Sequence, residues 1–257
     1  FLRGAMSDVH YSNLIRAANA IIGSLHLRRR FDFHLLSHWE RKREKSNNPL
    51  VKKGRKFFSQ NDEDGILLEI ISRMGLAPGV FAEFGVGTGL ENNSLILLMS
   101  DWRGVWLGGQ DLSFPIPQGC RNLHFSKNWI TAENAAPLLM QALAVIGERN
   151  PDILSIDLDG NDYYLLSNIL TSGIRPKIIV AEYNGKFPPP IAWSIAYDPA
   201  HRWEGSDYQG ASLQMFLNLL IPQRYRLVAC NITGSNAFFV DDSFASAFMD
   251  VATNPSD

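Results

Sequence analysis

The stretch FAEFGVGTGLENNS, residues 81–94, decides the fold because it joins an apolar run to closely spaced glycines. Gly85, Gly87 and Gly89 occupy alternate positions. Glycine destabilises the interior of a helix or strand by roughly 0.5–1 kcal/mol relative to alanine, so the pattern predicts a tight turn or a close approach of backbone to another group. The apolar run predicts a buried strand that leads into this turn, and a helix is expected to begin near Leu90.

Apolar runs and helical stretches alternate along most of the chain. Strands are predicted for VFAEFGV at 80–86, GVWLGG at 104–109, LHFS at 123–126, DILSIDL at 152–158 and KIIVAEY at 177–183. Continuous apolar strands separated by helices are typical of a parallel sheet covered on both faces. RYRLVACNI and NAFFVDD, joined by TGS, predict an antiparallel hairpin at the sheet edge. The fold class is therefore α/β.

A helix is expected over GILLEIISRMG, residues 65–75. Ser59 followed by Asp62 resembles a helix N-cap, with Asp62 and Glu63 in the positive first turn. Gly75 is the expected C-cap because glycine readily takes the left-handed conformation that ends many helices. These signals place the start of the regular α/β pattern close to residue 59.

Composition indicates an ordinary globular protein. The 257 residues are 46% hydrophobic and 19% charged, with a formal net charge of −2, which gives no reason to expect nucleic acid or an anionic membrane as a partner. No apolar run approaches the roughly 18 residues of a membrane span. Cys120 and Cys230 lack metal-ligand spacing, and a cytoplasmic location is the simpler interpretation, although one disulfide stays open.

Residues 1–56 differ from the rest and predict an N-terminal helical extension, followed by one domain over residues 57–257. The extension has apolar residues at helical spacing and becomes strongly basic toward its end. FLRGA, before Met6, is interpreted as a remnant that precedes the natural start. The basic block is read as a solvated helical face. The alternatives are a lid, an anion-binding patch or an arm that pairs two chains into a homodimer.

The order of six pieces resembles the class I S-adenosylmethionine-dependent methyltransferases, and within them the FkbM-like branch. The pieces are SQNDEDGIL, FAEFGVGTGLENNS, ILSIDLDGNDYYLL, VAEYN, YQGASL and NAFFV, which together span roughly residues 59–241. The resemblance implies a Rossmann-like, seven-stranded, mostly parallel sheet whose last strand is antiparallel. It also implies that S-adenosylmethionine lies across the first strands.

The resemblance places the glycine turn in the cofactor site, and position after the predicted strands adds candidates in two further places. The methionine part would be cradled by Glu83, Gly85, Gly87 and Gly89. After the third strand, Asn128 and Trp129 are placed to touch the adenine. Asp157, after the fourth strand, is the first candidate to position the methionine part or the acceptor.

The second predicted strand departs from the family pattern. Such enzymes usually end this strand with an acid that holds the ribose hydroxyls, whereas this chain has Gly108 and Gly109 there. Either Asp111 reaches back, or Gln110 substitutes with a neutral hydrogen bond, or cofactor binding is altered. Losing one charge-assisted hydrogen bond costs about 1.5–3 kcal/mol, which weakens binding without abolishing it.

Acidic residues follow two of the predicted strands. IDLDGND supplies Asp157, Asp159 and Asp162, and AEYN supplies Glu182 together with Tyr183 and Asn184. Because the strands are parallel, both groups should project from the same edge. Their oxygens could hold Mg²⁺ or Ca²⁺, but a metal is not favoured because the strong histidine and carboxylate spacings are absent. Alternatively, they bind cofactor and acceptor, or Asp159 and Asp162 serve only as turn and cap residues.

Candidate roles in methyl transfer follow from this placement. Asp159 is the candidate base or metal ligand, and Tyr183 and Asn184 are expected to orient the acceptor. The irregular, aromatic-rich segment 186–209 is expected to build the acceptor pocket. His201 within it is a candidate general base because its unperturbed pKa lies near neutrality, or else a packing residue.

The sequence thus predicts an S-adenosylmethionine-dependent methyltransferase that acts on a hydroxyl of a small molecule or glycoside in small-molecule biosynthesis. One alternative is an enzyme that cyclises S-adenosylmethionine or transfers another part of it. A dinucleotide oxidoreductase is disfavoured because the spacing is G-x-G-x-G rather than G-x-G-x-x-G. A non-catalytic scaffold is the third alternative, and the acids expected to converge on a cleft argue against it.

Overall fold

The computed structural model describes residues 36–252. The chain divides into two compact units between Lys45 and Ser46, and residues 36–45 of the first unit form a helix. The other predicted helical residues of the N-terminal extension lie outside the described residues. Residues 46–56, predicted to belong to that extension, are part of the second unit, where Leu50 is fully buried.

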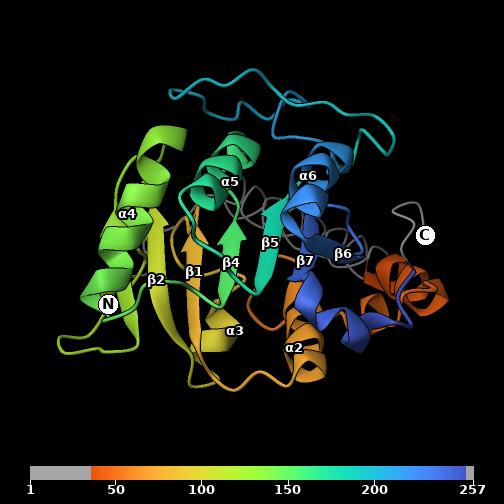
Figure 1. Ribbon diagram of the computed structural model, residues 1–257, viewed down its shortest axis with the longest axis horizontal. Coiled ribbons are helices and arrows are strands. Elements are labelled where there is room, and N and C mark those ends of the chain that lie inside the picture. Colours follow the sequence, from red (N-terminus) through yellow and green to blue (C-terminus); the bar gives the residue numbers. More distant parts are fainter. Residues whose placement is uncertain (1–35, 253–257) are drawn as a thin grey trace, which may run out of the picture. The chain divides into compact units, whose positions relative to one another are not determined.

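The second unit is built around a seven-stranded sheet with the order β3-β2-β1-β4-β5-β7-β6. The strands are β1 (Val80–Phe84), β2 (Arg103–Gly108), β3 (Leu123–Lys127), β4 (Ile153–Ile156), β5 (Ile178–Glu182), β6 (Tyr225–Cys230) and β7 (Asn236–Asp241). The first five strands pair in parallel, whereas β7 is antiparallel to both β5 and β6 (Figure 1). The predicted Rossmann-like sheet with an antiparallel hairpin at its edge is confirmed.

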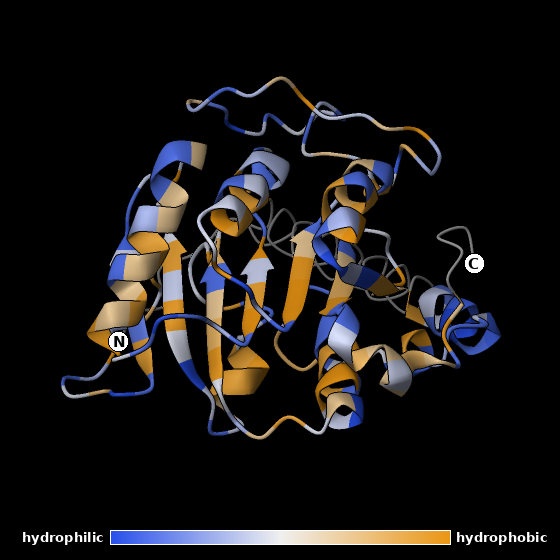
Figure 2. Cartoon of the chain, viewed as in Figure 1, coloured by the Kyte–Doolittle hydropathy of each residue, from blue (hydrophilic) through white to orange (hydrophobic). Residues whose placement is uncertain are grey.

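The helices of this unit are α2 (Glu63–Met74), α3 (Leu95–Leu98), α4 (Ala132–Val145), α5 (Asp162–Thr171) and α6 (Leu213–Leu220), with short 3-10 turns η1 (Val51–Lys53), η2 (Ile221–Gln223) and η3 (Asp242–Phe248). In Figure 1, α4, α5 and α6 lie side by side over one face of the sheet. All five residues of β1 and all four of β4 are buried. Burial on both faces explains why the central strands are mostly apolar, and in Figure 2 orange segments on these strands are interrupted by blue and white ones.

Two helix starts differ from the sequence prediction. The helix α2 begins at Glu63 with Asp62 at the N-cap, so the predicted N-cap at Ser59 is wrong. The backbone N–H of Ser59 instead donates to the Asp64 carboxylate at 2.9 Å, inside a turn that precedes the helix. At the other end, Gly75 takes a left-handed φ of 63° and caps α2 as predicted.

The helix expected near Leu90 begins only at Leu95 and is four residues long. The chain between the glycines and α3 stays in turns because the Glu83 carboxylate accepts hydrogen bonds from the backbone N–H groups of Asn93 and Ser94. This contact joins residues about ten apart and is not visible in a local sequence pattern. The glycine turn therefore leads into a second turn rather than directly into a helix.

A long loop, residues 186–211, joins β5 to α6 and is called the roof loop below. It contains no helix or strand apart from an isolated bridge between Ser194 and Ala211. It crosses beyond the arrowheads of the strands in Figure 1, and its hydropathy is mixed in Figure 2. The predicted irregular segment is confirmed, and its position brings it over the carboxyl ends of the strands.

Both cysteines, Cys120 and Cys230, are free thiols. Among residues 36–252, no helix combines the length and the apolar character needed to cross a membrane.

Candidate functional site

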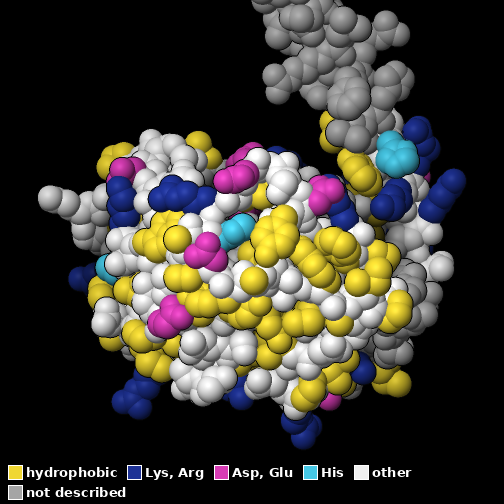
Figure 3. All heavy atoms as spheres, turned by 90° about the horizontal axis from the view of Figure 1, so that it is seen from above, with side chains coloured by type: hydrophobic (Ala, Val, Ile, Leu, Met, Phe, Trp, Pro, Cys, Tyr) yellow, Lys and Arg dark blue, Asp and Glu magenta, His cyan; other side chains and the backbone are white. Residues whose placement is uncertain are grey.

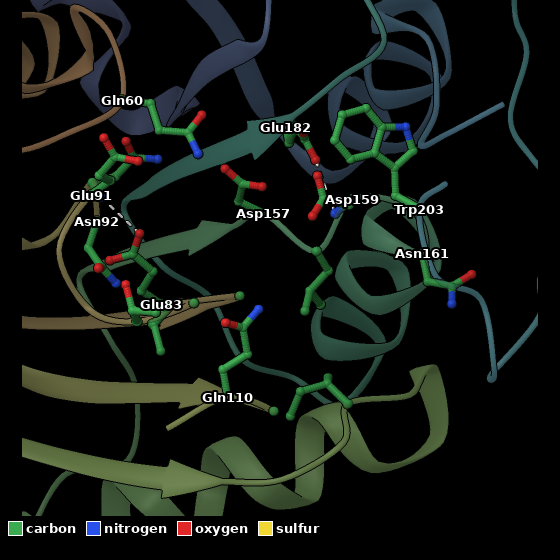
Figure 4. A pocket seen from close by; sticks show the side chains of 18 of the residues that line it. Gln60, Glu83, Glu91, Asn92, Gln110, Asp157, Asp159, Asn161, Glu182 and Trp203 are labelled. Carbon is green, nitrogen blue, oxygen red and sulfur yellow. Dashed lines mark hydrogen bonds between the residues drawn. The ribbon is translucent and has the colours of Figure 1, made fainter. Parts of the chain in front are cut away.

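A pocket of about 700 Å³ lies at the carboxyl ends of the parallel strands. Its walls come from the ends of β1, β2, β4 and β5, the start of β7, the turn around Gln60 and the roof loop. The volume falls within the roughly 300–1,000 Å³ of typical small-molecule sites. Figure 4 shows polar side chains from these elements facing a common space.

The structure brings most of the predicted site residues together, but not all of them. The pocket is lined by Glu83, Gly85, Gly87, Trp129, Asp157, Asp159 and His201. The remaining predicted residues, Gly89, Asp111, Asn128, Tyr183 and Asn184, do not belong to the lining. The roles suggested for the lining and the non-lining residues stay predictions. The contacts of each residue, described next, indicate which of these roles its position allows.

The glycine turn serves two different purposes. At Gly85, φ is 81° and an added Cβ would overlap the backbone carbonyl of Asp157, so the close approach there is to the chain itself. At Gly87, φ is 49° and an added Cβ would meet nothing within 4 Å. Gly87 therefore offers bare backbone to the pocket, whereas Gly89 faces the side chains of Leu112 and Phe114.

Glu83 lies at the inner end of the same turn and is almost fully buried. One carboxylate oxygen accepts a hydrogen bond from the backbone N–H of Asn93 at 2.9 Å, and the other accepts from the N–H of Ser94 at 3.0 Å and from its hydroxyl. Burial raises the pKa of Glu83, and these hydrogen bonds oppose the rise. Glu83 thus holds the turn in shape while its carboxylate also borders the pocket.

The end of β2 places Gln110, not Asp111, at the pocket. The Asp111 carboxylate forms an ion pair with Nζ of Lys127 at 2.6 Å, and its side chain is 84% exposed. Gly109 and Gln110 line the pocket, and Figure 4 shows the Gln110 amide directed into it. The side chain that the end of β2 brings to the pocket is therefore the neutral Gln110 amide, which follows the two glycines at the position of the expected acid.

Three carboxyl groups meet at the opposite side of the pocket. One oxygen atom each of Asp157, Asp159 and Glu182 lies within 4.8 Å of the others, and these three residues are called the carboxyl cluster. Glu182 also accepts a hydrogen bond from the backbone N–H of Asp159 at 3.2 Å. Such an oxygen set suits Mg²⁺ or Ca²⁺, and it equally suits a ligand that donates hydrogen bonds.

Burial dominates the electrostatics of the carboxyl cluster. It raises the pKa of Asp157 to about 8, with repulsion from Asp162 and Asp159 adding to the effect. Burial and repulsion from Asp157 raise the pKa of Glu182 well above its ordinary value. Asp162 itself accepts hydrogen bonds from the backbone N–H groups of Leu158 and Gly160, so it stabilises the turn before α5. The cluster therefore holds protons when no cation is near.

His201 reaches the pocket from the roof loop. Its ring lies against Gly160, where an added Cβ would overlap the ring atoms. Within the described residues, the buried Nε2 atom of His201 has no hydrogen-bond partner. Burial raises the pKa of Asp159, and the neighbouring His201 lowers it. The histidine and this carboxyl group thus both line the pocket and influence each other electrostatically.

The roof loop is fastened over the pocket at several points. The Asn161 side-chain amide donates to the carbonyl of Asp198 at 2.8 Å, and Nε1 of Trp129 donates to the carbonyl of Pro199 at 2.7 Å. The guanidinium of Arg202 lies 4.5 Å from the centre of the Trp129 ring. The loop therefore closes the pocket from above and contacts the residue predicted to touch adenine.

The two predicted residues after β5 do not line the pocket: Asn184 supports the roof loop, and the Tyr183 hydroxyl lies against Cys230 of β6. The Asn184 amide donates to the carbonyls of Asp207 and Gln209 at 3.0 and 3.1 Å. Burial raises the pKa of Tyr183, whose hydroxyl interacts with Cys230. Their contacts favour a structural role for both side chains.

The outer surface of this region is largely apolar. Figure 3 shows the molecule from above, with hydrophobic side chains gathered across the face and acidic side chains and histidine among them. Ile191, Trp203 and Tyr208 of the roof loop are among the exposed hydrophobic residues. The mouth of the pocket thus combines apolar contact area with a few polar groups, as small-molecule sites commonly do.

Gln60 and Asn236 are among the lining residues that the prediction from sequence missed. Gln60 stands in a turn that is fixed by Asp64, whose carboxylate accepts hydrogen bonds from the backbone N–H groups of residues 57–59. Both residues belong to pieces that carried the family resemblance, SQNDEDGIL and NAFFV. These pieces were recognised in the sequence, but they are far from the glycine turn along the chain, so the sequence did not indicate that they reach the same pocket.

Comparisons with known proteins give structural similarity only. No protein-family model and no curated protein matches the chain. The solved structures that resemble it include 1,6-didemethyltoxoflavin-N1-methyltransferase of Burkholderia thailandensis with 1,6-didemethyltoxoflavin and S-adenosylhomocysteine bound. This similarity has a TM-score of 0.42 and 13% identity and covers 93% of this chain and 91% of that one.

Two further similar structures are an O-methyltransferase and an N-methyltransferase. TomG of Streptomyces achromogenes, an O-methyltransferase involved in tomaymycin synthesis and solved with S-adenosylmethionine, has a TM-score of 0.40 and 15% identity over 80% of this chain and 89% of that one. The glycopeptide N-methyltransferase MtfA with S-adenosylhomocysteine has a TM-score of 0.37 and 13% identity over 76% and 99%. Such low TM-scores do not carry a functional assignment, which has to rest on the pocket itself.

Proposed function

We propose that the chain is a class I S-adenosylmethionine-dependent methyltransferase of the FkbM-like branch that methylates a hydroxyl group of a small molecule or glycoside. The observation that carries this proposal is a single pocket in which the bare backbone at Gly87 faces a carboxyl cluster across the ends of β1 and β4. A parallel sheet binds ligands at this edge.

The residues present fit the cofactor. Gly87 leaves room for a ligand against its backbone, and Glu83 places a buried carboxylate beside it. The Gln110 amide reaches the place where ribose hydroxyls would need a partner, and Trp129 offers an indole ring to the adenine. When bound, S-adenosylmethionine supplies an activated methyl group on a sulfonium centre.

The chain's own groups then orient the acceptor and take its proton. Asp159, an exposed residue at the pocket, can accept the hydroxyl proton because partial desolvation raises the pKa of its carboxyl group, which makes the carboxylate a stronger base. His201 is the second group placed for this task. The roof loop covers part of the pocket, and limiting the access of water in this way would favour transfer to the acceptor over side reactions.

We also place this activity in the cytoplasm, because free thiols at Cys120 and Cys230 suit a reducing compartment. The net charge of −2 supports a small-molecule acceptor over nucleic acid. Pairing of two chains through residues 1–56 remains a proposal, and most of those residues lie outside the described part of the chain.

Calorimetric titration tests the proposal directly. S-adenosylmethionine and S-adenosylhomocysteine should each bind with an affinity in the micromolar range, and NAD should not bind. An acceptor screen by mass spectrometry should then find products heavier by one CH₂ group. Failure of both sulfur nucleotides to bind would contradict the proposal and favour a non-catalytic scaffold.

A further inference from the structure

The hydrogen-bonding groups at the inner end of the pocket indicate what charge the acceptor carries. This end is formed by the carboxyl cluster and by Asn236, the first residue of β7. Asn236 and Glu182 are directly opposite each other in the antiparallel pairing of β7 with β5. Directly opposed residues point to the same face with Cβ atoms about 4.5–5.5 Å apart, so the Asn236 amide lies beside the cluster.

A neighbouring residue fixes which way the Asn236 amide points. Its Nδ2 atom donates a hydrogen bond to Oε1 of Glu63 at 3.1 Å. Glu63 is buried, and the same oxygen also accepts from Nδ2 of Asn231 at 2.7 Å. The nitrogen of the Asn236 amide is therefore committed to Glu63, and the oxygen is the atom left for another partner.

That oxygen is a buried acceptor without a donor. Asn236 is only 3% exposed, and its Oδ1 atom has no hydrogen-bond partner within residues 36–252. A buried acceptor left unpaired costs about 1–3 kcal/mol. Because Asn236 lines the pocket, a ligand that donates a hydrogen bond would satisfy it.

The groups at this end are acidic, and each carboxyl group becomes a negatively charged hydrogen-bond acceptor when it ionises. The cluster contributes three carboxyl groups and Asn236 contributes a carbonyl oxygen. Among the described lining residues there is no lysine, and the arginine that lines the pocket, Arg202, lies over Trp129. An anionic acceptor would be repelled here, whereas a cationic donor would meet several partners.

Resting on the proposed methyltransferase function, we infer that the acceptor carries a protonated amino group that binds between the carboxyl cluster and Oδ1 of Asn236. The acceptor class is then an amino sugar or a similar amino alcohol, with its hydroxyl presented toward the cofactor side. An ammonium group has three N–H donors, for which the three carboxyl groups and Oδ1 of Asn236 offer acceptors. Its positive charge would also favour the ionised form of the buried carboxyl groups.

Matched sugars test the inference. Glucosamine, glucose and glucuronate share a ring of similar size and differ in charge. Their binding would be measured by calorimetry on the EDTA-treated protein saturated with S-adenosylhomocysteine. Glucosamine should bind at least about tenfold more tightly than glucose, and glucuronate should bind most weakly. Equal binding of glucosamine and glucose, or a preference for glucuronate, would overturn the inference.

Variants show which residues cause the preference for glucosamine over glucose. Glu182→Gln and Asn236→Leu should each remove most of the preference for glucosamine over glucose. Asp250→Asn removes an exposed carboxylate that pairs with Arg73, so it is the control for overall charge and should keep the preference. Binding of S-adenosylhomocysteine to each variant reports that the fold is intact. An unchanged preference in Glu182→Gln would contradict the inference even if Asn236→Leu fails to fold.

Further arms separate the inference from its alternatives. If Mg²⁺ binds the EDTA-treated protein and expels glucosamine, the cluster is a metal site and the inference is wrong. If S-adenosylhomocysteine binds but no sugar preference appears, the inference fails while the proposed function stands. For this comparison the titrations are repeated without the nucleotide. If the amine preference persists in a protein that binds no sulfur nucleotide, the ammonium site stands and the proposed function fails.

Discussion

Asp111 is held 2.6 Å from Nζ of Lys127 outside the pocket, while its neighbour Gln110 lines the pocket. The acid that follows β2 is therefore already paired, and under the proposed function the neutral Gln110 amide would bind the ribose. Gln110→Glu should restore a charge-assisted hydrogen bond and tighten the binding of S-adenosylhomocysteine by about tenfold, as measured by calorimetry. Gln110→Ala should weaken it.

The competing hypothesis is that Asp111 reaches back to the ribose. The variant Asp111→Asn separates the Gln110 hypothesis from the Asp111 hypothesis. In this structure the Asp111 carboxylate faces Lys127 and the solvent, so its loss should not weaken the binding of S-adenosylhomocysteine if Gln110 holds the ribose. A tenfold loss of affinity in Asp111→Asn, together with no change in Gln110→Ala, would show that the side chains rearrange when the ligand binds.

Much of the fold could be predicted because its signals are local. The central strands are buried on both faces, so their sequences are mostly apolar, and Gly75 ends α2 through its own backbone conformation. The start of α3 could not be predicted in the same way. It depends on the Glu83 carboxylate binding the backbone of Asn93 and Ser94, a contact set by the turn.

The candidate site also combines residues that local sequence signals predict with residues that only long-range contacts bring to the pocket. Glu83, Gly87 and Asp157 follow strands, so the parallel sheet alone brings them to one edge. Asn236 reaches the pocket only because β7 turns antiparallel beside β5, and its amide is oriented by Glu63 from a distant part of the chain. Such placements depend on pairing and long-range hydrogen bonds, which a single sequence does not display.

Two glycines of the same turn should respond differently to alanine. Gly85→Ala would place a Cβ on the backbone carbonyl of Asp157 at a positive φ, so the free energy of unfolding should fall by at least about 3 kcal/mol. Gly87→Ala meets open space and should cost only about 1–2 kcal/mol of conformational strain, while weakening the binding of S-adenosylhomocysteine. Urea denaturation and calorimetry would check both, and equal losses of stability would contradict the assignment.

The buried acids predict that stability falls with rising pH in the ligand-free protein. Burial raises the pKa of Asp157 to about 8 and that of Asp162 to about 6, against about 3.9 for an exposed aspartate. The folded state therefore binds more protons than the unfolded state between about pH 4 and pH 8, and the free energy of unfolding decreases across this range. We expect a decrease of at least about 2 kcal/mol between pH 5 and pH 8 in urea denaturation.

Asp157→Asn provides the matched comparison for this pH dependence. The amide cannot ionise, so the variant should lose less stability than the wild type between pH 5 and pH 8 and should be the more stable of the two at pH 8. Parallel curves for the two proteins would show that Asp157 is not the group responsible.

The fastening of the roof loop through Trp129 predicts a change in protease sensitivity. Trp129→Ala removes both the hydrogen bond to Pro199 and the ring beneath Arg202, so trypsin should cleave after Arg202 several times faster. Trp129→Phe keeps an aromatic face and should give an intermediate rate. Lys186, which pairs with Asp207 elsewhere in the loop, provides an internal control site that should be cleaved at an unchanged rate. Unaltered cleavage after Arg202 would mean that other contacts hold this segment.

The role of His201 as a base can be tested by changing either the histidine or Gly160, against which its ring packs. His201→Gln keeps a polar side chain of moderate size but cannot act as a base, so kcat should fall by about 10²-fold or more while the affinity for S-adenosylhomocysteine stays the same. Gly160→Ala keeps the histidine but displaces its ring, because the added Cβ would overlap the ring atoms. This variant should therefore also lower kcat. Asp159→Asn distinguishes the two candidate bases, because the residue that takes the proton should cause the larger loss. If His201→Gln retains full kcat, the histidine only packs against the turn, and Asp159 becomes the remaining candidate.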